Sequence, residues 1–397
     1  KDAFQECDTS GMTFATVKHS YLVKKSNDLP RVLKEAFHVA KTGRPGPVLI
    51  DLPKDVLAGV CTASFSDEMD LPGYKIPTYA DTSAVEQTAE LLKASKKPLL
   101  LVGHGAMISN ASRQVKELAE KLNAPVTSTL LGLGVFPADH ELSLGMLGMH
   151  GTVYANKAVL DCDLIFSIGS RFDDRITGKL EEFCKNAKII HLDIDPAEQG
   201  KVLQPDIFLC GDVKLVLEQL LPMVTRLDSA DWVKTVQTWK KRYPLTYPKQ
   251  GGLRMQHVIH TLCELTKGKA ILNVDVGQHQ MWAAQFFRAN YPRQLHNSGG
   301  AGTMGFGFPS SIGASFGNTT GWPVCCIAGD GGFQMTQSEL ATAAIHKLPI
   351  KIFVLDNKYL GMVRQWQDMF YDKRYSSVDL IGNPDFVKLA EAYGIPG

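Results

Sequence analysis

The stretch Val324-Cys325-Cys326-Ile327-Ala328-Gly329-Asp330-Gly331-Gly332 decides the fold class of this chain. Its first five residues are apolar without polar alternation, which predicts a strand that is buried on both faces, as in a parallel sheet. Similar apolar runs alternate with helical patterns, at residues 98–102, 164–168, 189–192, 271–274 and 350–355. The sequence therefore predicts an α/β fold in which parallel sheets are flanked by helices.

Length and local composition divide the chain into parts. At 397 residues it is too long for one ordinary core, and two stretches rich in Pro, Gly and charge, 66–79 and 240–253, indicate linkers. We expect an N-terminal piece at 1–65, a middle unit at about 80–225 and a C-terminal unit at 254–397. Within the middle unit, apolar residues at helical spacing predict a crossover helix over 112–122.

Charge and cysteine usage narrow the class of protein. A net charge of +1 without a basic block argues against nucleic acid or an anionic membrane as a partner, so small molecules are expected. No long apolar span or signal peptide is visible. The eight cysteines are scattered without metal-ligand spacing, which predicts reduced, mostly buried thiols and a cytosolic or organelle-matrix compartment.

The glycine-rich turn after the first quoted strand predicts a phosphate site. Glycines at Gly329, Gly331 and Gly332 would let the backbone approach phosphate oxygens, and Asp330 can offer a hard oxygen ligand to Mg²⁺. Ligands in open α/β sheets bind at such carboxyl ends of strands. Taken alone, Gly-Asp-Gly is also compatible with a plain turn.

The next strand ends in Asp356-Asn357, and Asn357 follows Asp330 by 27 residues. This separation accommodates one helix and one strand, so the two strand ends should converge. The amide oxygen of Asn357 and the backbone carbonyl of Tyr359 could then complete the protein's share of an octahedral Mg²⁺ site. Phosphate oxygens and water would supply the rest. The sequence thus predicts a site that holds a diphosphate through a divalent cation.

This pair of motifs resembles the signature of thiamine diphosphate enzymes, which is Gly-Asp-Gly followed by just under thirty residues and an Asn. Many members have Asn-Asn where this chain has Asp356-Asn357. The liganding Asn is the second one, so the cation site is retained. The extra carboxylate could alter its charge balance.

The segment Gly361-Met362-Val363-Arg364-Gln365-Trp366-Gln367 closely resembles acetohydroxyacid synthase, the acetolactate synthase family, and the resemblance covers essentially the whole chain. Five further blocks carry it, at residues 2–6, 44–54, 145–151, 171–175 and 276–282. It implies a pyrimidine-binding domain, a central Rossmann-like FAD-binding domain and a diphosphate-binding domain. A bacterial anabolic enzyme in the cytoplasm is implied, as a homodimer or dimer of dimers with a small regulatory subunit.

The resemblance also implies cofactor contacts. Gln278 and His279 would contact the diphosphate, and Met304 would be an apolar wedge under the bent cofactor, although ordinary core packing is an alternative. Other residues implied at thiamine diphosphate are Gly302, Gly329, Gly331, Gly332, Gly361 and Met362. Those implied at FAD are Arg44, Gly103, His104, Gly105, Thr129, Leu130, Met149, His150, Arg171, Asp173, Arg175, Asp193, Ile194 and Asp212. A surface ion-pair cluster is the alternative for the Arg171 to Arg175 block.

The implied reaction decarboxylates pyruvate on thiamine diphosphate and joins the two-carbon unit to pyruvate or 2-ketobutyrate. Trp366 would select the acceptor, with a structural aromatic role as the alternative, and Arg175 could reach the acceptor's carboxylate. Gln5 and Met304 complete the implied catalytic set. Residues implied along the substrate channel are Phe4, Lys54, Asp174, Val363 and Phe370.

The two ends of the chain bear on the expected activity. The sequence begins without an initiator Met, so we expect a fragment, with the family's activating glutamate before Lys1 and its closing segment after Gly397. Another carboligase, such as glyoxylate carboligase or the FAD-independent catabolic acetolactate synthase, is an alternative that Trp366 and residues 171–175 disfavour. An inactive cofactor-binding homologue is the other alternative.

Overall fold

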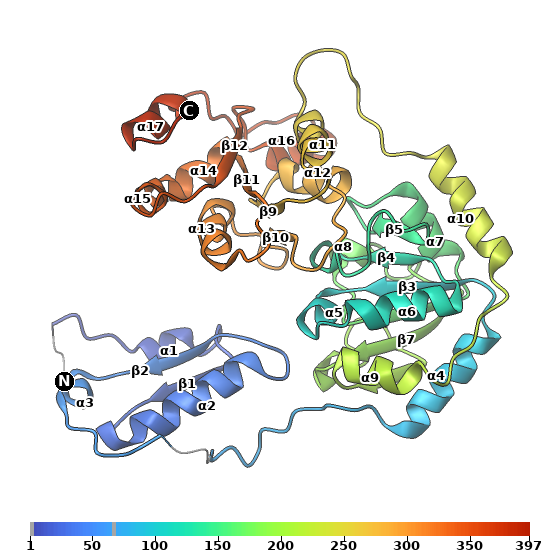
Figure 1. Cartoon of the computed structure of the whole chain (residues 1–397), viewed down its shortest axis with the longest axis horizontal. Helices are drawn as coiled ribbons and strands as arrows, with labels where there is room; N and C mark the ends of the chain where they lie inside the picture. The colour runs from blue at the N-terminus through green and yellow to red at the C-terminus, as the bar shows by residue number, and fades with distance from the viewer. Residues whose placement is uncertain (1–3, 66–68) are drawn as a thin grey trace.

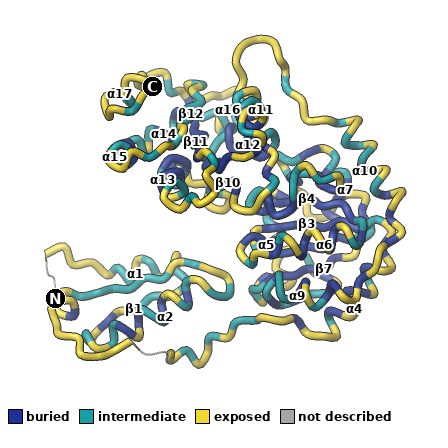
Figure 2. The backbone as a smooth tube through the Cα atoms, viewed as in Figure 1, coloured by how far each residue is buried: buried dark blue, intermediate teal, exposed yellow. Residues whose placement is uncertain are grey.

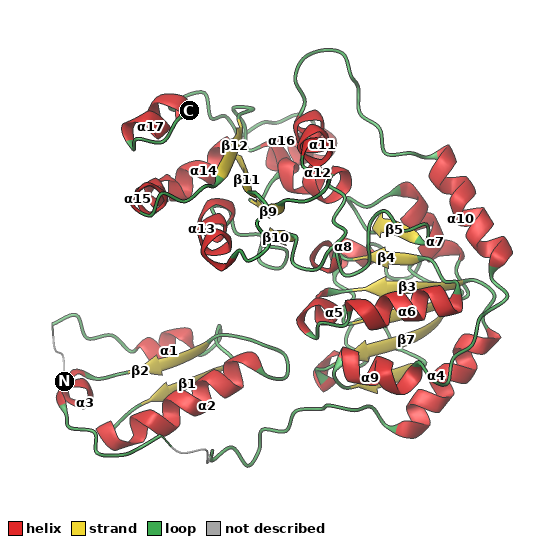
Figure 3. Cartoon of the chain, viewed as in Figure 1, coloured by secondary structure: helices red, strands yellow, loops and turns green. Residues whose placement is uncertain are grey.

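The computed structural model describes residues 4–65 and 69–397. Residues 1–3, which open the predicted N-terminal piece and include Asp2 and Ala3 of the first resembling block, lie outside the described residues. So do residues 66–68, at the start of the first predicted linker. The described residues form three separate parallel sheets flanked by helices (Figures 1 and 3). The predicted α/β class is confirmed.

The N-terminal piece is a β-α-β unit around a two-stranded sheet. Strand β1 (His19–Leu22) pairs in parallel with β2 (Val48–Asp51), and α2 (Leu29–Lys41) crosses between them. Three short helices complete it: α1 (Thr9–Thr13), η1 (Ser26–Asp28) and α3 (Lys54–Ala58). Its core contains few buried side chains, and Figure 2 shows most of its surface as exposed or half-buried.

The middle unit is built on a six-stranded parallel sheet. Its strands are β3 (Pro98–Val102), β4 (Val126–Ser128), β5 (Ser143–Met146), β6 (Leu164–Ile168), β7 (Lys188–Asp193) and β8 (Ile207–Cys210). Their order is β5-β4-β3-β6-β7-β8, so the direction of winding reverses between β3 and β6. This is the order of a doubly wound sheet, in which ligands bind outside the strand ends at the reversal.

Helices cover both faces of this sheet. They are α4 (Thr82–Ala94), α5 (His104–Ile108), α6 (Ser112–Leu122), α7 (Val153–Asp161), α8 (Asp174–Thr177), α9 (Val213–Leu220) and α10 (Ala230–Arg242), with the turns η2 (Leu130–Gly132) and η3 (Pro196–Glu198). Because successive strand residues face opposite sides, Leu100 packs in the core under α6 and α9, whereas Leu101 packs in the core that contains Trp232 of α10. Both faces of β3 are therefore buried, as its apolar run predicted.

The C-terminal unit holds a four-stranded parallel sheet in the order β10-β9-β11-β12. The strands are β9 (Ile271–Val274), β10 (Leu295–Asn297), β11 (Val324–Gly329) and β12 (Lys351–Leu355). The helices are α11 (Met255–Leu265), α12 (Gln278–Phe286), α13 (Gly307–Gly317), α14 (Asp330–Thr336), α15 (Leu340–Ile345), α16 (Gly361–Phe370) and α17 (Phe386–Ala392), with the turn η4 (Gln337–Glu339).

Two local predictions need correction. The glycine-rich segment after β11 was expected to be a turn, but α14 begins at Asp330, so the two following glycines are helical. The second linker was expected from residue 240, but α10 continues to Arg242. The Lys240 ammonium donates to the carbonyl of Ser143 at 2.8 Å, which holds that last turn on the middle unit.

Two broader properties follow from the coordinates. None of the helices within residues 4–65 and 69–397 is both long enough and apolar enough to cross a bilayer. All eight cysteines are free, and five of them are buried, which confirms the prediction of mostly buried thiols.

Candidate functional site

A cavity of about 1610 Å³ lies where the three parts of the chain meet. Its volume exceeds that of a typical pocket for one small ligand, so it has room for an extended ligand or for two. The predicted residues that line it on the N-terminal and middle parts are Arg44, His104, Gly105, Thr129, Leu130, His150, Arg171, Asp173, Arg175, Asp193, Ile194 and Asp212. Those from the C-terminal unit are Gln278, His279, Gly302, Met304, Gly329, Asp330, Gly331, Gly332, Asn357, Tyr359, Gly361, Met362, Val363 and Trp366.

Seven predicted residues do not line this cavity: Phe4, Gln5, Lys54, Gly103, Met149, Asp174 and Phe370. Phe4 is 92% exposed and Phe370 is 63% exposed. Met149 nevertheless contacts the cavity wall, since its sulfur accepts from Nη1 of Arg175 at 3.5 Å. Gly103 supports the wall from behind, where a Cβ would lie 2.1 Å from the carbonyl oxygen of Gly169. A side chain at this reversal point would separate the ends of β3 and β6.

The two predicted strand ends converge in the C-terminal unit. Strands β11 and β12 pair in parallel, with Gly329 opposite Leu355, so the residues that follow each strand lie side by side. Asp330 is 2% exposed, and its Oδ2 accepts the N–H of Lys358 at 2.9 Å. The amide oxygen of Asn357 accepts the N–H of Tyr359 at 3.0 Å. The predicted cation ligands are thus adjacent and ordered by their own loop.

The charge environment of Asp330 suits a cation. Burial raises the pKa of its carboxyl, and the nearby carboxylate of Asp356 raises it further, while a hydrogen bond from Asn383 opposes both effects. A divalent cation bound at this carboxyl would lower its pKa, because the cation favours the ionised carboxylate. The described residues contain no cluster of three His, Cys, Asp or Glu that could hold a metal alone. A carboxylate, an amide oxygen and a backbone carbonyl fit Mg²⁺ that takes its other ligands from phosphate and water.

The entrance to α12 forms a second part of this site. The ring of His279 is buried, its Nε2 has no hydrogen-bond partner, and burial lowers its pKa to about 4. A Cβ at Gly277 or at Gly329 would lie 2.8 or 2.9 Å from its Cε1. The ring therefore fits only between two glycines. Its buried, unpartnered nitrogen marks a place for a polar ligand group.

Another glycine that leaves room for neighbouring side chains, Gly361, lies at the start of α16. A Cβ at Gly361 would lie 2.5 Å from Oε1 of Gln278 and 2.8 Å from Nδ2 of Asn357. Gln278 is held in turn by its hydrogen bond to Oε1 of Gln365 at 2.8 Å. Gln278 and Asn357 therefore sit close together at one end of the cavity, and both fit a diphosphate bound through a cation.

Sequence reasoning missed the buried carboxylate of Asp275. It is 0% exposed, and it accepts backbone N–H groups from Val276 at 2.6 Å and from Gly305 at 3.0 Å. Burial raises its pKa, and these donors oppose that effect. The contact with Gly305 fixes the turn beside Met304, whose methyl carbon lies 3.6 Å from the Cβ position of Gly331. The sequence pattern that predicted Asp330 was also present here, because Asp275 directly follows β9 just as Asp330 directly follows β11.

Two predicted residues meet across the boundary between the middle and C-terminal units. The guanidinium of Arg175 in α8 lies 5.7 Å from the ring centroid of Trp366 in α16. A second contact joins the same units, since Nε2 of Gln285 donates to the carbonyl of His150 at 2.7 Å. Burial lowers the pKa of His150, and the charge of Arg175 lowers it further. This neutral imidazole and the Arg175 cation share one wall of the cavity.

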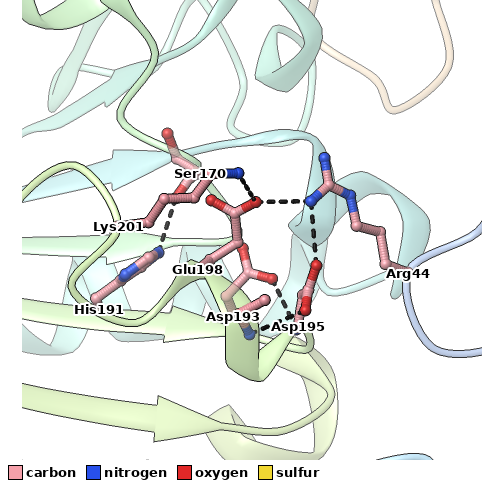
Figure 4. A network of polar contacts seen from close by, with 8 residues as sticks. Arg44, Ser170, His191, Asp193, Asp195, Glu198 and Lys201 are labelled. Carbon is pink, nitrogen blue, oxygen red and sulfur yellow. Dashed lines mark hydrogen bonds and ion pairs between the residues drawn. The ribbon is translucent and has the colours of Figure 1, made fainter. Parts of the chain in front are cut away.

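A network of charges after β7 adjoins the other end of the cavity, where Arg44 and Asp193 line the wall (Figure 4). Nη1 of Arg44, from the N-terminal piece, lies 2.6 Å from Oε1 of Glu198 and 3.1 Å from Oδ2 of Asp195. Nζ of Lys201 also reaches Glu198, at 3.0 Å. Burial raises the pKa of Asp193 to about 6. Asp195 and Glu198 were not predicted; their signal was the acidic run that follows the strand.

This end of the cavity also fits a nucleotide-type ligand. It lies beside the reversal point of the doubly wound sheet, where such ligands bind. Among the described residues, the hydroxyl of Ser170 is buried without a hydrogen-bond partner, and so is Nδ1 of His191. A bound polar group could satisfy the Ser170 hydroxyl, since Ser170 lines the cavity.

Two family models match the chain. The model described as "Thiamine pyrophosphate enzyme, central domain" matches residues 85–220, and "Thiamine pyrophosphate enzyme, C-terminal TPP binding domain" matches residues 275–397. The first match contains all of the six-stranded sheet, and the second begins directly after β9 and contains the other three strands of the four-stranded sheet. Fold, cavity and family models together define a thiamine diphosphate enzyme.

Curated relatives identify the family more closely. The chain is 49% identical to acetolactate synthase of Mycobacterium bovis and 48% identical to that of Mycobacterium leprae, over 100% of this chain and 66% and 65% of those proteins. It is 45% identical to the acetolactate synthase isozyme 3 large subunit of Escherichia coli, over 100% of this chain and 71% of that protein. The chain belongs to the acetolactate synthase large-subunit family. It spans about two thirds of the length of these relatives.

Proposed function

We propose that the protein is an acetolactate synthase. It would decarboxylate pyruvate and join the two-carbon unit to a second pyruvate, giving 2-acetolactate, or to 2-ketobutyrate, giving 2-aceto-2-hydroxybutyrate. This is the first common step in the biosynthesis of the branched-chain amino acids. The observation that carries the proposal is the cavity, where the Asp330 end of the C-terminal unit opens toward Arg175 and Trp366. The identity of 49% and 45% to the named relatives, over the whole of this chain and about two thirds of their length, supports it.

We propose that Mg²⁺ and thiamine diphosphate occupy the C-terminal end of the cavity and that FAD occupies the end near β7. Asp330, Asn357 and the carbonyl of Tyr359 would hold the cation, and Gln278 and His279 would face the diphosphate. When bound, thiamine diphosphate supplies the carbanion chemistry, and the chain's residues bind and orient it. Met304 would support its bent form, since it lies against the turn that Asp275 fixes.

The acceptor substrate would lie between the middle and C-terminal units. Arg175 is a bidentate donor and could orient the acceptor's carboxylate, while the ring of Trp366 would favour an acceptor that carries an extra methyl group. Phe4, Gln5 and Lys54 are exposed and do not line the cavity of their own chain. We propose that they complete the site of a neighbouring protomer in a homodimer or dimer of dimers. A small regulatory subunit and a cytoplasmic location belong to the same proposal.

The cation site tests the proposal directly. Asp330→Ala should abolish Mg²⁺-dependent binding of thiamine diphosphate, measured by calorimetry on the intact protein, because the remaining oxygens carry no charge against the cation. Asp385→Ala is the control, since Asp385 caps α17 in the same unit. Unchanged affinity in Asp330→Ala would refute the site.

A product assay tests the reaction. The intact protein with pyruvate, Mg²⁺ and thiamine diphosphate should form acetolactate, which is detected colorimetrically, and the rate should depend on FAD. Full activity without FAD would favour the catabolic type of acetolactate synthase. Formation of product from glyoxylate instead would favour glyoxylate carboligase.

A further inference from the structure

Two carboxylates at the cation site share the same pair of hydrogen-bond donors. The N–H of Lys358 lies 2.9 Å from Oδ2 of Asp330 and 3.1 Å from Oδ1 of Asp356. Nδ2 of Asn383 lies 2.7 Å from the same Asp330 oxygen and 3.0 Å from the same Asp356 oxygen. Asp330 is buried and Asp356 is exposed, so these shared donors hold an exposed carboxylate close beside the buried one.

The orientation of Asn383 is itself fixed. Its Oδ1 accepts Nε2 of Gln334 at 2.8 Å, and the same Gln334 nitrogen lies 3.3 Å from the carbonyl oxygen of Asp330. Gln334 can only donate through that nitrogen, so the amide of Asn383 must turn its own nitrogen toward the two carboxylates. A reversed amide would place an oxygen against two negative charges.

The backbone around Asn383 is anchored to the cation loop. The N–H of Leu380 donates to the carbonyl of Lys358 at 2.8 Å, and the N–H of Leu360 donates to the carbonyl of Val378 at 2.8 Å. Val378 is 1% exposed, so this pairing is held by a buried side chain. The segment after α16 therefore returns to support the loop after β12, and it delivers Asn383 at a defined position.

We propose that Asn383, oriented by Gln334, is a positioning residue of the cation site. It fixes one oxygen of Asp330 and so presents the carboxylate to the cation in a single orientation. It also holds Asp356 beside Asp330, where the second carboxylate would add negative charge near a bound cation. This inference rests on the proposed function. Mg²⁺ demands near-ideal octahedral geometry, whereas Ca²⁺ tolerates irregular ligands, so the loss of orientation should affect Mg²⁺ more.

The test compares two cations in the same binding measurement. Thiamine diphosphate is titrated calorimetrically into the intact protein, once with MgCl₂ and once with CaCl₂. Asn383→Ala should weaken Mg²⁺-supported binding by about 10- to 100-fold, as is typical when a partner of a metal ligand is removed. Ca²⁺-supported binding should weaken by only about threefold, because Ca²⁺ accepts a reoriented carboxylate. Gln334→Met should give a smaller loss in the same direction.

A matched control and the Ca²⁺ titration separate positioning from folding. Asn318→Ala removes a half-buried amide that donates to the carbonyl of Trp322 at 2.8 Å. Asn318 lies before the start of β11, whereas Asp330 follows its end, so this change should leave both titrations unchanged. An equal loss with both cations in Asn383→Ala, or no loss with Mg²⁺, would overturn the positioning role. If the unaltered protein binds thiamine diphosphate with neither cation, the proposed function itself is refuted.

Asp356→Asn separates charge from orientation. It removes the negative charge but keeps an oxygen that can accept from Asn383 and Lys358. Binding should weaken by a similar factor with both cations, because the lost attraction depends on charge and not on coordination geometry. Unchanged binding with both cations would overturn the charge contribution of Asp356.

Discussion

Acid should destabilise the C-terminal unit through the buried imidazole of His279. Burial lowers its pKa from 6.5 to about 4, so the folded protein keeps the ring neutral while the unfolded chain takes up a proton below pH 6.5. The free energy of unfolding should therefore fall as the pH drops from about 6.5 to 4 and change little above pH 7. At about 1.36 kcal/mol per pH unit, the full effect of this one group is about 3 kcal/mol.

The assay is urea unfolding at several pH values between 4 and 8, for the protein and for His279→Gln, with Trp fluorescence as the signal. Trp282 of α12, together with Trp322 and Trp366, reports on this unit, whereas Trp232 and Trp239 of α10 report on the middle unit. Other groups also titrate in this range, including Asp193, whose raised pKa of about 6 acts in the opposite direction. The difference between the two proteins isolates His279. A difference that stays constant from pH 8 to pH 4 would refute the reasoning.

Two further predictions concern the boundary between the parts of the chain. Trp366→Leu in the intact protein should lower the preference for 2-ketobutyrate over pyruvate by about tenfold, measured as the product ratio in competition, because the ring that favours the extra methyl group of 2-ketobutyrate is lost; an unchanged ratio, or the same change in Trp322→Leu, would contradict its selector role. Arg44→Met should lower the free energy of unfolding by about 1–2 kcal/mol in urea titrations, because Glu198, which is 2% exposed, keeps only Lys201 as an ionic partner. Adding Glu198→Gln should restore most of that loss, and a further loss in the double variant would count against the buried pair.

Six strands, β3, β6, β7, β9, β11 and β12, could be predicted closely from their apolar runs. A strand that is buried on both faces leaves a run without polar residues, and the predicted run at 98–102 matches β3. The start of α14 could not be predicted in this way. Glycines usually weaken a helix, yet Gly332 belongs to α14. Glycine is required at this position because a Cβ would lie 2.9 Å from Oδ2 of Asp275, a residue far away in sequence.

The site could be predicted where its residues follow a strand directly. Asp330 and Asn357 each lie one or two residues beyond a strand end, so the topology of a parallel sheet brings them together. Asn383 lies outside that rule. It reaches the site because the chain returns after α16, where the N–H of Leu380 donates to the carbonyl of Lys358. No local sequence pattern predicts this long-range contact.

The contact between Arg175 and Trp366 links the two halves of the cavity. An Arg held over an aromatic face restrains the ring, and here Arg175 belongs to α8 of the middle unit and Trp366 to α16 of the C-terminal unit. The space that Trp366 leaves for an acceptor therefore depends on how the middle unit sits against the C-terminal unit. The hydrogen bond from Gln285 to His150 fixes the same boundary at the C-terminal end of α12, whereas Gln278 at its N-terminal end lies by the proposed diphosphate position. A ligand bound near β7 would thus influence acceptor choice by stabilising the position of the middle unit, without touching Trp366 itself.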